Sequence, residues 1–203
     1  MTIFFTADTH FFHPNIVRYD RRPFANFEEM TEVLIKRWNA RVRPGDTVYH
    51  LGDFALSAGI RSALPIENVF NSLSGHKWLI KGNHDRREVE RCRWVKVSDY
   101  HELKVDLGGE HKQRIVLFHY ACRVWNQIHR GAWMLHGHSH GNLSDAGGKT
   151  LDVGVTCHDY APVSLEEVAE YMKNREIVTV DHHTLEMGEE RPYESSGSSA
   201  VGE

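Results

Sequence analysis

Short apolar runs alternate with segments of helical periodicity along this sequence, and this alternation restricts its fold more than any other feature. Residues 3–5 form an apolar run that suits a buried strand, whereas apolar residues within 26–42 recur at helical spacing. The same criteria predict helices over 60–73 and 164–174, and strands over 48–51, 78–80, 95–97, 101–106, 113–118, 132–135, 150–153 and 176–180. Ser164-Leu165-Glu166-Glu167 resembles the N-cap and acidic first turn of the last helix. Strand–helix alternation comes first, and closely spaced strands with a hairpin turn at Gly108-Gly109 follow. This order predicts an α/β fold with a mixed sheet, or two sheets, and helices outside.

The length and charge of the chain limit its organisation and its partners. We expect one folded domain over 1–181 and a polar, disordered tail over 182–203. A net charge of -4 argues against a broad basic face for extended nucleic acid or a membrane surface. Arginine groups such as Arg21-Arg22 are expected at the solvated surface.

Two further properties indicate where the protein resides. No apolar run approaches the length that spans a bilayer, so no membrane association is expected. The three cysteines are far apart and form no Cys-x-x-Cys pair, which is typical of reduced thiols. We therefore expect a cytoplasmic protein.

Five apolar runs are each followed at once by a side chain that can bind a metal ion. These side chains are Asp8 and His10, then Asp53, then Asn83, then His119, and finally His138 and His140. In α/β sheets, ligands bind beyond the carboxyl ends of parallel strands, so residues remote in sequence converge there. A glycine precedes Asp53, Asn83 and His138, which fits tight turns and a close approach of the backbone. One Asp or His in such a place is more commonly a turn residue or a helix cap. Five together, in a chain with fifteen histidines, favour a shared metal site.

The ordered motifs resemble those of the calcineurin-like metallophosphoesterases. The matching blocks are Asp8-x-His10, Gly52-Asp53, Gly82-Asn83-His84-Asp85, His119 and Gly137-His138-Ser139-His140. The segments 8–15 and 119–140 look closest to small uncharacterised bacterial and phage members. The resemblance implies a four-layer α/β/β/α sandwich with two mixed sheets and a dinuclear metal site at the carboxyl ends of the strands. Ser139 and His136 depart from common family usage, but neither change removes a ligand.

The resemblance also implies a role for each motif residue. One metal ion would be held by Asp8, His10 and His140. The second would be held by Asn83, His119 and His138, and Asp53 would bridge both ions. His84 would face the leaving group or the phosphate without binding metal, and Asp85 would orient His84.

The implied reaction is hydrolysis of a phosphoester at two divalent metal ions. Such ions, about 3.5–4 Å apart, share a hydroxide that attacks phosphorus in line, and a carboxylate bridge holds their spacing. The leaving alkoxide then needs a proton or a positive partner, which is the role expected of His84. Oxygen and imidazole ligands without thiolate suit Mn, Fe, Zn, Co or Ni, and Mn is our first expectation.

The compact chain indicates a substrate class. Because little sequence lies outside the family core, we expect a phosphodiesterase acting on a small or nucleotide-derived diester. A phosphomonoesterase, including a protein phosphatase, would use the same site, and the acidic balance disfavours a nuclease for long nucleic acid. A catalytically silent metal-binding scaffold is another alternative, which the complete ligand set and His84 disfavour. The oligomeric state and the physiological substrate are left open.

Four further residues are candidates for substrate contact. Asn15 and Arg18 follow the first motif, although a structured loop and a helix start at Pro14 are the favoured interpretation there. Arg123 and His129 lie between the last two motifs and could line the mouth of the site.

Other residues near the motifs are given no chemical role. Trp125 could line the pocket or belong to the core. Cys122 is interpreted as a buried small hydrophobe, since nothing indicates a lowered thiol pKa. His50 is interpreted as surface or structural, and Asp152 is given no role.

Overall fold

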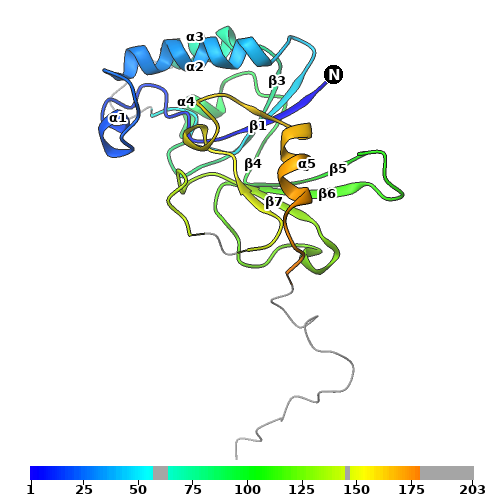
Figure 1. Ribbon diagram of the computed structural model, residues 1–203. Helices are drawn as coiled ribbons and strands as arrows, with labels where there is room; N and C mark the ends of the chain where they lie inside the picture. The colour runs from blue at the N-terminus through cyan, green and yellow to red at the C-terminus, as the bar shows by residue number, and fades with distance from the viewer. Residues whose placement is uncertain (57–63, 145–146, 179–203) are drawn as a thin grey trace, which may run out of the picture.

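The computed structural model describes residues 1–56, 64–144 and 147–178 (Figure 1). Its strands are β1 (Ile3–Thr6), β2 (Thr47–His50), β3 (His76–Ile80), β4 (Val97–Ser98), β5 (Tyr100–Val105), β6 (Gln113–Phe118), β7 (Trp133–His136), β8 (Thr150–Asp152) and β9 (Val163–Ser164). Its helices are α1 (Ile16–Tyr19), α2 (Phe27–Arg41), α3 (Leu64–Ser72), α4 (Arg87–Glu90) and α5 (Leu165–Lys173), with short 3-10 helices η1 (Ile128–Arg130) and η2 (Val155–Cys157).

The strands form two mixed sheets, as the sequence predicts. The first sheet has the order β4-β3-β2-β1-β9, in which β9 alone is antiparallel to its neighbour. The second has the order β5-β6-β7-β8, in which β5 and β6 form the antiparallel hairpin expected at Gly108-Gly109. The parallel strands of both sheets therefore direct their carboxyl ends toward a common region.

Helices α2 and α3 lie along one face of the first sheet (Figure 1). On α2, Met30, Leu34 and Trp38 are buried at helical spacing, and they join Ile66 and Phe70 of α3 in one hydrophobic cluster. The Asn26 side chain accepts a hydrogen bond from the Glu29 N–H and so begins α2 where the periodicity begins.

The space between the two sheets holds a second hydrophobic cluster. Phe5 and Ile80 come from the first sheet, and Leu117 and Leu135 come from the second. Helix α5 packs Val168 into the same cluster. Its start carries the capping box expected at Ser164, which exchanges hydrogen bonds with Glu167.

The outer face of the second sheet is covered by the segment that carries η1. Trp125 and Ile128 pack against Val116 and Met134, so Trp125 belongs to the core at this face. This outer layer consists of an irregular segment and one turn of 3-10 helix.

Some predicted boundaries change in the structure. The strand predicted over 176–180 is wrong for 176–178, because these residues form no regular secondary structure and Val178 packs on the outer face of the second sheet. The predicted start of the second helix, the residues 179–180 and the tail over 182–203 lie outside the described residues. Within the described part of the chain, no helix is long and apolar enough to cross a membrane.

Candidate metal centre

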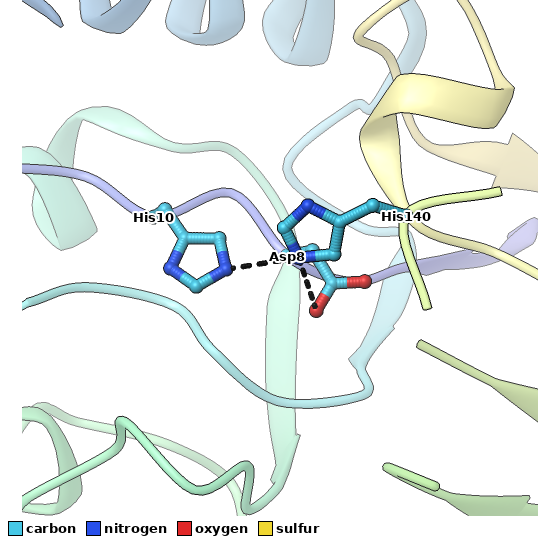
Figure 2. Close-up of side chains that lie close together, drawn as sticks. All are labelled: Asp8, His10 and His140. Atoms are coloured by element: carbon cyan, nitrogen blue, oxygen red, sulfur yellow. Dashed lines mark hydrogen bonds and ion pairs between the residues drawn. The ribbon is translucent and has the colours of Figure 1, made fainter. Parts of the chain in front are cut away.

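The first cluster of possible ligands joins the end of β1 to the loop after β7. One ligand atom each from Asp8, His10 and His140 lies within 4.8 Å of the others. The Nε2 atoms of His10 and His140 are 3.2 Å apart, and His140 Nε2 is 3.8 Å from Asp8 Oδ1 (Figure 2). Figure 2 shows the two imidazole rings facing each other, with the Asp8 carboxylate beside the His140 ring.

The second cluster joins the end of β2 to the ends of β6 and β7. Asp53, His119 and His138 offer ligand atoms within 4.8 Å of one another, and Asn83 Oδ1 is 3.1 Å from His119 Nε2. His119 Nδ1 is 2.7 Å from the Leu51 carbonyl oxygen, which can only accept, so this nitrogen carries the proton. The lone pair of Nε2 therefore faces Asn83 and Asp53, as a metal ligand requires.

Asp53 stands between the two clusters. Its Oδ2 is 3.6 Å from His10 Nε2 and 3.5 Å from His119 Nε2, while its Oδ1 accepts a hydrogen bond of 2.9 Å from the His84 N–H. A single carboxylate oxygen thus faces both sets, which is the geometry expected of a bridging ligand.

Five of the expected ligands have a left-handed backbone. The φ angles are 57° at Asp8, 49° at His10, 56° at Asp53, 66° at His138 and 48° at His140. Non-glycine residues adopt this region at a cost, and such residues concentrate at functional sites. The left-handed turns direct these side chains inward from the strand ends.

Glycines before the motif residues allow the backbone segments to approach closely. A Cβ at Gly82 would lie 2.2 Å from Asp53 Oδ1, and one at Gly52 would lie 2.5 Å from His119 Nδ1. A Cβ at Gly137 would lie 2.8 Å from Asp8 Oδ2. The expected close approach is therefore present at all three, and Gly154, 2.7 Å from Asp8 Oδ2 by the same measure, adds a fourth.

The electrostatics of the first cluster fit divalent cations. Burial raises the pKa of Asp8 to about 8, and the nearby Asp152 and Asp53 charges oppose its ionisation further, although His140 acts the other way. Burial also lowers the pKa of His10 well below its usual value. The protein therefore places a buried carboxylate beside the neutral imidazole of His10, and divalent ions would supply positive charge there. The oxygen and nitrogen donors, without thiolate, suit a hard or intermediate divalent ion.

Asp20 and Arg22 support the first cluster, and the sequence did not reveal them. Asp20 Oδ2 is 2.9 Å from His140 Nδ1, 2.8 Å from Arg22 Nε and 2.9 Å from the hydroxyl of Thr156. Arg22 also donates to the carbonyl of Asp8 at 2.8 Å. The expectation that Arg22 is a solvated surface residue is wrong, because its side chain is buried against these acceptors.

Asp152, which was given no role, also supports this region. Its Oδ2 accepts from the Gly141 N–H at 3.0 Å and its Oδ1 from the Gly154 N–H at 2.8 Å. It therefore fixes the backbone beside His140 and beside Asp8. Its position at the end of β8, next to the end of β7, was the available sequence signal.

Asp85 also holds the backbone of the site. Its carboxylate accepts three backbone N–H groups, from Asp53 at 2.8 Å, Phe54 at 2.9 Å and Gly82 at 2.9 Å. Asp85 therefore fixes the loops that carry Asp53 and Asn83, and its role in orienting the His84 ring stays a prediction. That ring lies half-buried near the first cluster, with its centroid 5.4 Å from that of His10.

The structure separates the substrate candidates into two places. Asn15 is the N-cap of α1 and Arg18 lies within this helix, with its guanidinium 5.3 Å from the Tyr19 ring centre. The Tyr19 ring contacts the His13 ring, and the His13 ring centre is 6.3 Å from that of His84. The rings of Tyr19 and His13 therefore connect the Arg18 side of α1 to His84. Exposed Arg123 and half-buried His129 flank Trp125 on the outer face of the second sheet. Their contact with substrate stays a prediction.

Two other interpretations find support. His50 is structural, because it is fully buried and its Nε2 is 3.0 Å from the Thr9 hydroxyl. Burial raises the pKa of the Cys122 thiol, which agrees with a small hydrophobe and not a nucleophile.

Known proteins resemble this chain over nearly its whole length. The uncharacterized protein MJ1445 of Methanocaldococcus jannaschii is 33% identical over 182 residues, covering 87% of this chain and 94% of that protein. Gene 66 protein of Mycobacterium phage D29 is 28% identical over 200 residues, covering 86% and 97%. The crystal structure of AQ665, a protein of unknown function from Aquifex aeolicus, has a TM-score of 0.64 at 24% identity and covers 84% of this chain and 98% of its own. It shares the fold.

The family follows from the sequence as a whole. The sequence model of the calcineurin-like phosphoesterases matches residues 1–199. This family has a dinuclear metal site, and the two Asp/His clusters lie where the ordered motifs of the chain converge. The chain therefore belongs to the calcineurin-like phosphoesterase family, which indicates metal-dependent hydrolysis of a phosphoester.

Proposed function

We propose that this protein is a phosphodiesterase that hydrolyses a small or nucleotide-derived diester with two divalent metal ions, manganese being the first candidate. The observation that carries the proposal is the position of Asp53, whose Oδ2 lies within 3.6 Å of His10 Nε2 and 3.5 Å of His119 Nε2. One carboxylate between two imidazole sets suits a pair of ions that share a ligand.

Each cluster would hold one ion through the residues described above. Asp8, His10 and His140 would bind the first, and Asn83, His119 and His138 would bind the second. When bound, the ions supply Lewis acidity, an activated water and stabilisation of the charge that develops on the phosphoryl oxygens. Asp20 would hold the His140 ring, and Asp85 would hold the loop of Asp53.

His84 would act on the leaving group. Its backbone N–H donates to Asp53, and its ring is half-buried beside His10. Both features hold the His84 ring at the edge of the site. Proton donation to a leaving alkoxide by such a residue contributes roughly 10²- to 10⁴-fold to rate.

A diester is preferred over a monoester because the second cluster is open. His138 and Asn83 are exposed, so the second cluster leaves room for the second ester group of a diester. A phosphomonoesterase remains the alternative within the same site. The separated, unpaired cysteines and the net charge of -4 support a cytoplasmic enzyme for small phosphoesters.

The test is a comparison of bis(p-nitrophenyl) phosphate with p-nitrophenyl phosphate, using protein loaded with Mn²⁺. Both release the same chromophore, so the ratio of kcat/KM values reports the ester class. Asp53→Asn provides the blank, and Asp159→Asn, which changes an exposed carboxylate paired with Arg37, provides the matched control. We expect faster turnover of the diester by the wild-type protein and by the control.

Two results would change the proposal. Preference for the monoester would make the protein a phosphatase and overturn the substrate class. Binding of two ions without turnover of either ester would favour the catalytically silent scaffold.

A further inference from the structure

A hollow of about 330 Å³ adjoins the second cluster. Its lining includes Asn83 from the loop after β3, Phe118 and Tyr120 from the end of β6, and Lys81 and Asp99 at its polar side. Small-molecule sites typically measure about 300–1,000 Å³ and combine apolar walls with a few polar groups. This hollow is at the lower end of that range and shares a residue with the proposed metal site.

Two aromatic rings form a wall that runs from the hollow to the second cluster. The Tyr120 ring centre is 5.6 Å from that of Phe118 and 4.7 Å from that of His138. The Tyr120 hydroxyl donates to Asn83 Oδ1 at 3.4 Å. Tyr120 is nevertheless 40% exposed, so a large part of its surface remains available to a ligand. Flat aromatic surface beside a phosphoester site favours a planar ring in the substrate.

The lining of the hollow also offers a donor and an acceptor. Lys81 Nζ lies 2.9 Å from Asp99 Oδ1. Asp99 is largely exposed, so the pair can exchange hydrogen bonds with a ligand without burying an unpaired charge. Aromatic rings together with a donor and acceptors in the lining of one hollow match a nucleobase, which has two flat faces and a polar edge.

We propose that this hollow binds a nucleobase of the substrate, stacked on Phe118 and Tyr120, while the phosphate lies at the two clusters. The inference rests on the proposed function and narrows its substrate class to nucleotide-derived esters. A larger hollow of about 450 Å³, lined by Asp152 and Tyr171, is the competing place. Both hollows carry carboxylates, Asp152 in the larger and Asp85 and Asp99 in the smaller, so the choice between them rests on the Phe118 and Tyr120 rings and is decided by single variants.

The test measures binding, so it needs no turnover. Protein loaded with Mn²⁺ is titrated calorimetrically with an acyclic adenine phosphonate, whose C–P bond resists hydrolysis, and with methylphosphonate. Base stacking on an aromatic side chain contributes roughly 5- to 150-fold to affinity. We expect the adenine compound to bind tighter by a factor in that range.

Single variants locate the binding. Phe118→Leu should bring the ratio of the two affinities close to one, while methylphosphonate affinity and metal content stay near wild type. Tyr120→Leu should lower the ratio in the same way when it is compared with Tyr120→Phe, which also lacks the hydroxyl that contacts Asn83. Tyr120→Phe should keep most of the ratio because the ring remains. Tyr171→Leu, which alters the competing hollow, should leave the ratio unchanged.

Two results would overturn the inference: equal affinities in the wild-type protein, or a preference for adenine that survives both leucine variants. Loss of the preference in Tyr171→Leu would assign the base to the larger hollow and would also overturn it. These outcomes are distinct from failure of the proposed function. A preference for adenine without diester turnover would remove only the reaction, and diester turnover without that preference would remove only the base site.

Discussion

The two clusters differ in depth and in what holds them. In the first, Asp8 and His10 are 0% and 2% exposed, and His140 is held through the Asp20 carboxylate. In the second, Asn83 and His138 are exposed to solvent.

Their supports differ in charge as well as in burial. The first cluster is supported by a network of ionised groups, because Arg22 contacts both Asp20 and the Asp8 carbonyl. The second is supported by contacts between neutral groups, such as His119 Nδ1 to the Leu51 carbonyl and the Tyr120 hydroxyl to Asn83, and by the Asp85 carboxylate, which accepts backbone N–H groups. The comparison indicates that the deeper set favours retention of an ion, and that the open set favours entry of the substrate.

Asp53→Asn should remove the difference between the clusters, because Asp53 alone faces both. We expect loss of both ions and a fall in diester turnover on the order of 10⁴-fold or more, since groups that act as a unit are lost together. Metal analysis by mass spectrometry and the rate with bis(p-nitrophenyl) phosphate check this. Turnover near the wild-type rate would disprove the bridging role.

His84→Ala should leave both clusters intact and lower only the rate. We expect a loss of roughly 10²- to 10⁴-fold, largest for esters with poor leaving groups, because these need the proton most. The measurement is kcat across aryl and alkyl diesters, with metal content determined in parallel. If the variant lost an ion instead, His84 would have to be counted among the ligands.

Asp20→Asn should weaken only the first cluster. Loss of the group that holds a ligating histidine costs about 10- to 100-fold in metal affinity. A Mn²⁺ titration should therefore show one weakened site and one unchanged site. Asp159→Asn is the matched control, because Asp159 is an exposed carboxylate that pairs with Arg37. Equal weakening of both sites would show that the clusters are not independently supported.

His50→Gln should change how the free energy of unfolding depends on pH. His50 is buried beneath the deeper, first cluster, where it contacts the Thr9 hydroxyl. Burial lowers the pKa of His50 to about 3, from 6.5, so between these values the unfolded chain binds a proton that the folded chain does not. The contribution of His50 to the free energy of unfolding therefore falls as pH falls, by about 2 kcal/mol between pH 7 and pH 5. Urea unfolding of metal-free protein at both pH values should show the wild type losing about 2 kcal/mol relative to the variant, because the other titrating groups, Asp8 among them, are common to both proteins. An identical pH dependence in both proteins would mean that His50 is already protonated or exposed.

The sequence predicted the parts of the molecule that depend on local pattern. The helix over 26–42, the Ser164 cap and the two mixed sheets follow from periodicity, capping residues and the family resemblance, and the structure confirms them. The glycines at 52, 82 and 137 announced close approach because few other residues permit it.

The parts that the sequence missed depend on tertiary contacts. Arg22 stands in a short group of arginines, and such groups usually lie at the solvated surface. Only the folded chain shows its guanidinium in contact with Asp20 and the Asp8 carbonyl. Asp85 is next to His84 in the sequence, whereas its carboxylate accepts the backbone N–H groups of Asp53 and Phe54, which are 32 and 31 positions away. The left-handed φ angles at five ligands carry no residue signature either, because none of these residues is glycine.

Each cluster takes side chains from both sheets, as Asp8 and His140 do in the first and Asp53 and His119 do in the second. Bound ions would therefore connect the two sheets, and removal of the metal would lower the melting temperature as well as abolish activity. The catalytic rate would therefore depend on how accurately the two sheets are positioned against each other. A small change in the packing of Phe5 and Leu117 between the sheets would lower the turnover rate before it measurably lowered the free energy of unfolding.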